Sequence, residues 1–114
     1  MTQKMFQVKY TYSSRDDIRE KKEYILKKFK YKGLGKRFTE KIKKAVNKLK
    51  IFPNGYDTTG FKYRGYDIHF LSSQSYLLFF VVDEQKREVT ILRVLQDGQD
   101  WAYIIGQWLK ANVE

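Results

Sequence analysis

The segment "YLLFFVVDEQKREVTILRVLQDGQDW", residues 76–101, decides the predicted fold. Residues 76–82 are apolar at both odd and even positions, which is typical of a central strand covered on both faces. Polar residues 83–87 then predict a turn, and residues 88–95 predict the next strand. Asp100 is placed to cap a short helix whose apolar stripe is Trp101, Ile104, Ile105, Trp108 and Leu109.

Upstream of this segment, the sequence predicts a strand followed by a helical hairpin. Alternating apolar residues over 5–12 predict a half-buried strand, and helical spacing follows to about residue 29. Helix capping is expected at Ser13 or Ser14, with Asp16 and Asp17 in the first turn, where the helix dipole favours negative charge.

A second helix is expected after a tight corner at Gly33 and Gly35, and it ends before Pro53. Its apolar stripe is Phe38, Ile42, Ala45, Val46 and Leu49. The same helix points Lys41, Lys43, Lys44 and Lys48 toward water. With a further strand at residues 66–71, the fold class is α+β: a single domain over residues 1–114 in the order β-α-α-β-β-β-α. We expect an antiparallel sheet packed by the N-terminal helical hairpin, and a short C-terminal helix.

Composition excludes several classes of protein and site. The chain has no cysteine, so disulfide scaffolds, thiolate zinc sites and cysteine nucleophiles are excluded, and its single histidine excludes a histidine-pair metal site. We expect neither a bound metal nor a small-molecule cofactor. The absence of a signal-peptide pattern and of an apolar run near 20 residues predicts a soluble, cytoplasmic protein without membrane contact.

Positive charge is concentrated in the first part of the chain. The formal net charge is +10, yet residues 1–50 hold 17 basic and 5 acidic residues, whereas residues 51–114 hold 6 basic and 8 acidic residues. This asymmetry indicates a polyanionic partner, either nucleic acid or an acidic protein segment. The alternative is that the lysine-rich helix simply presents a solvated face.

Few residues are candidates for chemistry. Histidine is the side chain suited to proton transfer near neutral pH, and His69 shares a predicted strand face with Asp67, which suits acid–base work on a phosphodiester. The alternative is a half-exposed histidine without a role. If their segment is extended, Lys62 and Arg64 point the same way and can hold phosphates; the alternative is an ordinary polar loop.

The quoted segment, together with a preceding strand and basic helical hairpin, resembles the RelE/ParE superfamily of toxins from type II toxin–antitoxin modules. The most specific part is the pairing of "YLLFFVVDE" with "VTILRVLQDGQDW". The resemblance covers about residues 6–108 and implies a growth-arresting toxin that is inhibited by an acidic antitoxin protein. It also implies one of two targets, the ribosome with its mRNA or DNA gyrase.

The resemblance leaves the mode of action open. RelE-like members cut mRNA with basic residues on strands two and three, and with a basic or histidine group plus a tyrosine after the last strand. Here those positions correspond to Asp67 and His69, to Leu77, and to the corner Gln96–Gln99, so the basic set is depleted. The preferred interpretation is therefore ParE-like, non-nucleolytic and directed at gyrase.

Two alternatives remain at this point. The first is a ribosome-dependent mRNA endoribonuclease with His69, Arg64 and Arg93 as catalytic candidates, and with Lys62 and Gln96 as phosphate or partner contacts. The second belongs to another class: a double-stranded RNA-binding module, whose α-β-β-β-α order matches the chain from its second helix onward. The acidic start of the last predicted helix argues against this module.

Overall fold

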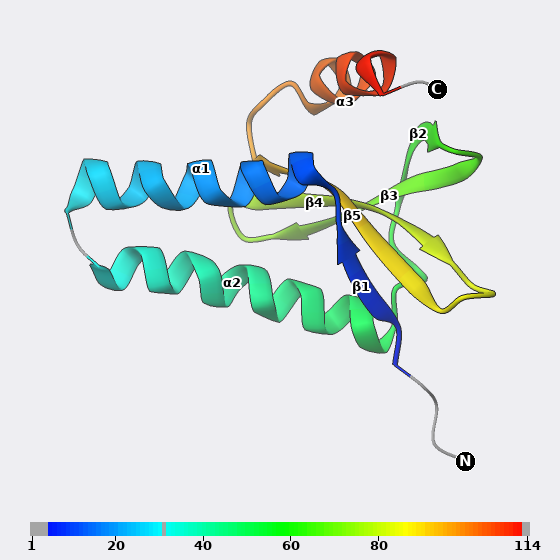
Figure 1. Cartoon of the computed structure of the whole chain (residues 1–114), viewed down its shortest axis with the longest axis horizontal. Coiled ribbons are helices and arrows are strands. Elements are labelled where there is room, and N and C mark those ends of the chain that lie inside the picture. The colour runs from blue at the N-terminus through cyan, green and yellow to red at the C-terminus, as the bar shows by residue number, and fades with distance from the viewer. Residues whose placement is uncertain (1–4, 31, 113–114) are drawn as a thin grey trace.

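A five-stranded sheet separates a long helical hairpin from a short C-terminal helix (Figure 1). The computed structural model describes residues 5–30 and 32–112. In chain order the elements are β1 Gln7–Tyr10, α1 Tyr12–Phe29, α2 Lys32–Ile51, β2 Thr58–Tyr63, β3 Tyr66–Ser73, β4 Tyr76–Asp83, β5 Glu88–Gln96 and α3 Trp101–Ala111. The predicted α+β class, the helical hairpin and the C-terminal helix are confirmed.

The sheet differs from the prediction in two respects. Strand β2 was not predicted, so four strands rather than three lie between α2 and α3. The strand order is β1-β5-β4-β3-β2, and β1 pairs with β5 in parallel, so the sheet is mixed rather than wholly antiparallel. No short hairpin joins β1 to β5, because the helices and three strands lie between them in sequence, and either direction of pairing is therefore open to β1.

Strand β4 is central and covered on both faces, as its apolar sequence predicts. Leu78 and Phe80 pack toward the hairpin, whereas Leu77, Phe79 and Val81 pack toward α3. Phe79 and Phe80 are fully buried. The sheet therefore carries one hydrophobic core on each face, and β3, β4 and β5 contribute buried residues to both.

The hairpin begins and turns differently from the prediction. Thr11, not Ser13 or Ser14, caps α1, and its hydroxyl accepts the backbone N–H of Ser14 at 3.1 Å. The glycines at 33 and 35 lie inside α2 instead of forming a corner. A β-carbon at Gly35 would lie 3.1 Å from the Leu26 side chain, so the missing side chain lets α2 approach α1 closely.

Helix α2 carries three parallel rows of residues with the spacing i, i+4, i+7, i+11. The middle row is buried and consists of Phe38, Ile42, Ala45 and Leu49. The row one position earlier is Arg37, Lys41, Lys44 and Lys48, and the row one position later is Thr39, Lys43, Val46 and Lys50. Because adjacent residues on a helix are about 100° apart, the earlier row and the later row lie on opposite sides of the buried row.

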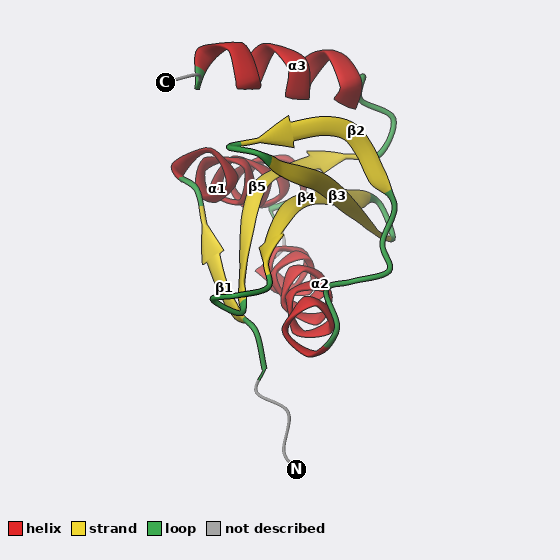
Figure 2. Cartoon of the chain, turned by 90° about the vertical axis from the view of Figure 1, so that its right-hand side faces the viewer, coloured by secondary structure: helices red, strands yellow, loops and turns green. Residues whose placement is uncertain are grey.

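Helix α3 covers the face of the sheet that the hairpin leaves open (Figure 2). Ile105 is fully buried there, and the Trp108 ring stacks on Tyr63 of β2 with 5.3 Å between ring centroids. The Trp108 indole N–H also donates to the Ser13 hydroxyl at 2.8 Å. Both tryptophans of the helix are thus packed, as the prediction required, and α3 is attached to the start of α1.

Candidate functional site

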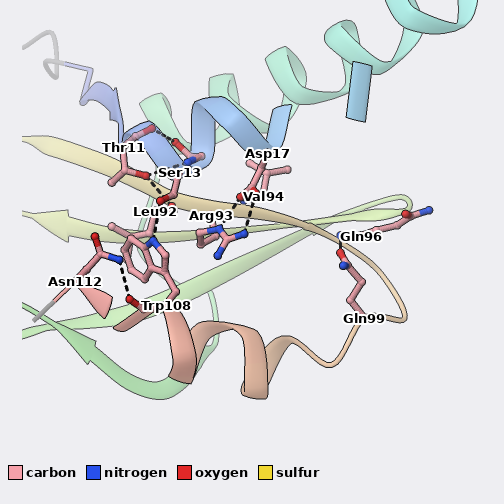
Figure 3. A network of polar contacts seen from close by, with 11 residues as sticks. Thr11, Ser13, Asp17, Leu92, Arg93, Val94, Gln96, Gln99, Trp108 and Asn112 are labelled. Atoms are coloured by element: carbon pink, nitrogen blue, oxygen red, sulfur yellow. Dashed lines mark hydrogen bonds and ion pairs between the residues drawn. The ribbon is translucent and has the colours of Figure 1, made fainter. Parts of the chain in front are cut away.

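A buried ion pair joins the first half of α1 to β5 (Figure 3). The Asp17 carboxylate accepts Nε of Arg93 at 2.7 Å and a terminal guanidinium nitrogen at 2.9 Å. It also accepts the backbone N–H of Val94 at 2.9 Å. The side chains are only 9% and 18% exposed, so this is a bidentate, largely desolvated pair.

The structure corrects the expectation that Asp16 and Asp17 lie in the first turn of the helix, because α1 begins at Tyr12 and no acidic residue lies in its first turn. Asp17 faces the sheet and is buried, whereas its neighbour Asp16 makes an exposed pair with Arg19. The same contact holds Arg93, a catalytic candidate of the nuclease alternative, against α1. Burial lowers the pKa of the nearby Lys21, and the Asp17 carboxylate acts in the opposite direction.

The hydrogen-bonded pairing of β5 with β1 ends at Tyr10, so β5 has no strand beside it on that side after this point. Beyond that point, Thr11 donates its backbone N–H to Ile91 and its hydroxyl to the Leu92 carbonyl at 2.7 Å. Leu92 lies at an irregularity in the β4–β5 register. The start of α1 therefore replaces a neighbouring strand along the rest of β5, satisfying backbone groups that would otherwise be buried without partners.

His69 lies on β3, away from the Arg93 pair. Its Nδ1 lies 3.0 Å from the Tyr56 carbonyl oxygen, and its ring stacks on Phe80 with 5.7 Å between centroids. Donation to that carbonyl requires a protonated Nδ1, which leaves Nε2 of the neutral ring as an acceptor. His69 is half-buried, so an acid–base role would have to use Nε2.

Lys62 and Arg64 do not point the same way. Lys62 lies on β2 and pairs with Asp67 at 3.5 Å, so the Asp67 carboxylate contacts this lysine. Arg64 lies in the β2–β3 turn with a left-handed φ of 52°, and its guanidinium stacks over the Tyr63 ring at 5.1 Å. The extended backbone that the prediction assumed is therefore absent at Arg64.

Strand β2 adds one strand to the predicted order, so the residues that the prediction places on the second and third strands lie on β3 and β4. Asp67 and His69 lie on β3, and Lys62 lies on the additional strand β2. Leu77 lies on β4 and is buried toward α3. A sequence signal for β2 existed in the alternation of Phe61 and Tyr63, but the glycine at 60 interrupts it.

The corner after β5 is a polar turn without cations. The backbone N–H of Gln96 donates to the Gln99 side chain at 2.7 Å, and Asp97 donates its N–H to the Ser75 carbonyl. Asp100 caps α3, as predicted, by accepting the Tyr103 N–H. Tyr103 is 64% exposed and is a tyrosine that follows the last strand.

The predicted lysine face of α2 divides into two surfaces. Arg37, Lys41, Lys44 and Lys48 line a cavity of about 380 Å³ against the β3–β4 turn, which we call the basic groove; its other lining residues are Glu40, Ser72, Ser73 and Gln74. Lys43 lies on the other side of the helix. The four lysines that the sequence points toward water therefore line two different cavities.

Lys43 borders a second cavity, of about 630 Å³, between α1 and α2, which we call the hairpin groove. Its apolar lining residues are Tyr10, Ile18, Ile42 and Val46. Its cationic lining residues are Arg15, Arg19, Lys22, Lys43 and Lys50, joined by Thr39 and Asn47, and no carboxylate lines it. An apolar floor with a positively charged rim is complementary to an acidic amphipathic segment.

Within residues 5–30 and 32–112 there is no group of three or more His, Cys, Asp or Glu side chains placed to hold a metal ion. Among the helices described, none is both long enough and apolar enough to cross a bilayer.

Comparison with known proteins assigns the family. A family model for the ParE toxin of the type II toxin–antitoxin system parDE matches residues 8–101. The chain belongs to the ParE toxin family. No protein of curated function matches this ParE-family chain by sequence. The family match confirms the predicted superfamily. The double-stranded RNA-binding alternative does not fit the structure, because four strands lie between α2 and α3.

Solved structures share the fold of this ParE-family chain at low sequence identity. The chromosomal ParDE toxin–antitoxin system of P. aeruginosa aligns with a TM-score of 0.64 and 18% identity, covering 81% of this chain and 96% of that one. The RelBE2 toxin–antitoxin complex of Mycobacterium tuberculosis gives 0.58 and 16%, covering 86% and 98%. The isolated RelE toxin of E. coli gives 0.54 and 16%, covering 95% and 99%. The ParE and RelE subgroups thus share this architecture.

Proposed function

We propose that the protein arrests growth in the ParE-like mode, acting without nuclease activity on a gyrase-type target, and that an acidic antitoxin protein inhibits it. The observation that carries the mode of action is the buried Asp17–Arg93 pair. The pair fixes Arg93, one of the three catalytic candidates, between β5 and α1. The match to the ParE family model supports the same mode.

The electrostatics around the remaining candidates support a non-nucleolytic mode. Cleavage of a phosphodiester develops negative charge, which requires cations or strong donors fixed close to the reacting group. Lys62 is paired with Asp67, and Asp97 and Asp100 follow β5. In the described part of the chain, no ion pair or hydrogen bond links a cation to His69. A nuclease centre would need a different arrangement of these residues.

The antitoxin partner is supported by the hairpin groove. The rim of this groove holds five cations, and its floor is apolar, so an acidic amphipathic segment gains both ion pairs and buried apolar area. Two of the solved relatives are a toxin–antitoxin system and a toxin–antitoxin complex, which agrees with a partner of this kind. We assign the hairpin groove to that segment.

Charge reversal at the groove rim tests the antitoxin assignment. Arg19→Glu/Lys22→Glu/Lys43→Glu is expected to weaken binding of the protein encoded by the adjacent reading frame by at least 100-fold in calorimetry. The matched control, Lys41→Glu/Lys44→Glu/Lys48→Glu, makes the same change of charge in the basic groove and is expected to keep at least a tenth of the affinity. Equal losses in both variants would refute a site at the hairpin groove.

The mode of action is tested by induction and by a purified assay. Induction of the gene alone is expected to stop growth, co-expression of the neighbouring gene to restore it, and the purified protein to inhibit plasmid supercoiling by gyrase. Normal growth under both conditions, with the protein folded and abundant, would overturn the proposal. Growth arrest with unimpaired supercoiling would instead overturn the gyrase-type target.

One observation favours the second candidate, a RelE-like ribosome-dependent mRNA endoribonuclease. Strand β2 carries Lys62, Arg64 follows it, and β2 pairs with β3, which carries His69. His69 would then act through Nε2 as acid or base. This candidate predicts new RNA ends within translated messages after induction, and their disappearance in His69→Gln. Unchanged message ends in the wild type would eliminate it.

A further inference from the structure

The basic groove places four cations along one side of α2. Arg37, Lys41, Lys44 and Lys48 follow one another at intervals of four, three and four residues. At 1.5 Å per residue, the row extends about 16 Å along the helix axis. The buried row beside it, which includes Phe38 and Leu49, fixes the rotation of the helix. The cations are therefore held in line against the β3–β4 turn.

The charge of this groove is largely uncompensated. Glu40 is the one carboxylate among its lining residues. None of the four cations forms an ion pair with another residue in the described ranges 5–30 and 32–112. Such a concentration of like charge costs stability in the isolated protein, so it is most readily explained by a polyanionic ligand.

We propose that the basic groove binds the sugar–phosphate backbone of duplex DNA without sequence specificity. Lysine and arginine contacts, assisted by hydroxyl and amide donors, are the usual means of holding backbone phosphates. The groove supplies these donors in Ser72 and Ser73 at the end of β3 and in Gln74 of the β3–β4 turn. With phosphates spaced about 3.4 Å apart along each strand axis, a 16 Å row spans roughly five of them.

The lining of the groove favours a duplex over the other polyanions. An acidic protein segment gains most of its affinity from apolar contacts, yet the groove lining contains no apolar side chain, unlike the hairpin groove. Single-stranded nucleic acid is usually held by bases stacked on aromatic rings, and the lining contains no aromatic residue either. Contacts to phosphates alone suit a regular double helix.

The two grooves lie on opposite sides of the buried row of α2. DNA in the basic groove and an acidic segment in the hairpin groove therefore use different residues of one helix. This inference goes beyond the proposed function and does not depend on the gyrase-type target. It implies that the antitoxin-bound protein still binds DNA through α2.

The test measures binding to a 20-base-pair duplex DNA by fluorescence anisotropy between 50 and 200 mM salt. With four phosphate contacts, the wild type is expected to lose about 100-fold in affinity over this range, because each contact adds about 0.9 to the slope of log K against log salt. The variant Arg37→Gln/Lys41→Gln/Lys44→Gln/Lys48→Gln is expected to reduce the magnitude of that slope by about 3 to 4.

The matched control replaces four exposed cations outside both grooves, Lys27→Gln/Lys28→Gln/Lys86→Gln/Lys110→Gln, and is expected to keep most of the slope. Circular dichroism confirms that each variant is folded, and Lys44→Glu/Lys48→Glu provides a second, smaller perturbation of the groove. Equal slopes for the two four-residue variants would overturn the proposal. Tighter binding of a poly-glutamate peptide or of duplex RNA, lost in the groove variant, would overturn the choice of DNA.

Discussion

Asp17→Ala is expected to be among the most destabilising single substitutions of a polar residue in this protein. The change removes a carboxylate that accepts three hydrogen bonds, two from the Arg93 guanidinium and one from the Val94 backbone. It leaves the guanidinium charge without a partner at a position where the side chain is only 18% exposed. The backbone N–H of Val94 is buried and loses its acceptor as well.

The magnitude follows from the burial of the pair. Removing one partner of a buried ion pair costs about 3–5 kcal/mol, because the remaining charge stays desolvated. Partial access of water to Arg93 places the expected loss at about 3 kcal/mol. With an m-value of about 2 kcal/mol per molar urea, the midpoint of urea unfolding is expected to fall by about 1.5 M.

Two variants control for local helix effects and for the charge itself. Asp16→Ala removes an exposed i,i+3 pair with Arg19 and is expected to change stability by less than about 0.5 kcal/mol. Asp17→Ala/Arg93→Met removes both charges and is expected to recover at least about 1 kcal/mol relative to Asp17→Ala. The reasoning fails if Asp17→Ala lowers the free energy of unfolding no more than Asp16→Ala does. It also fails if the loss in the double variant equals the sum of the losses in Asp17→Ala and Arg93→Met.

Three further changes test other parts of the framework. Thr11→Val removes the hydroxyl that caps α1 and bonds β5, and we expect urea unfolding to show a loss of about 1–3 kcal/mol. Trp108→Phe removes the indole N–H that binds the first turn of α1; we expect a loss of about 1–2 kcal/mol, with faster hydrogen exchange in α3. The Lys86 backbone amide, and additionally the Tyr66 hydroxyl, lower the pKa of Asp83 below its ordinary 3.8. NMR titration should show that pKa rising in Tyr66→Phe, and an unchanged value would contradict the role of the hydroxyl.

Local patterns in the sequence predicted the elements that local forces determine. The run at 76–82 is apolar on both parities, and the corresponding strand β4 is central and packed on both faces. The position of Asp100 before a helical stripe predicted the cap of α3. Both features depend on residues that are close together in the sequence, and hydrophobic periodicity predicts structure of that local kind.

Strand β2 lacks such a pattern, and the sequence therefore does not predict it. The sequence "TTGFKY", residues 58–63, contains a glycine with a φ of 87° beside a register irregularity with β3. This edge strand buries only one face, against α3, so its hydrophobic signal is half that of β4. Without β2, the sequence prediction numbers the strand at residues 66–71 as the second strand, whereas these residues lie on β3.

The Asp17–Arg93 pair could not be predicted from local spacing, because 76 residues separate its members. Asp17 has the sequence features of an ordinary first-turn acid, and Arg93 those of a strand residue with a free charge. Their contact depends on β1 ending at Tyr10 and on α1 continuing along β5 in its place. The pair is thus a consequence of tertiary structure, and so is the position of Arg93 against α1.

The rows of α2 connect the predicted charge asymmetry to two separate surfaces. The sequence places basic residues on both sides of a buried row, and helical geometry then turns them in opposite directions. The neighbouring elements make the two sides different: Ile18 of α1 and Tyr10 of β1 make one side partly apolar, whereas the end of β3 and the β3–β4 turn add only hydroxyl and amide groups to the other. The single excess of positive charge in the sequence therefore corresponds to two surfaces, which we propose bind an acidic protein segment and phosphates, and the matched reversals of charge on α2 test the two proposals separately.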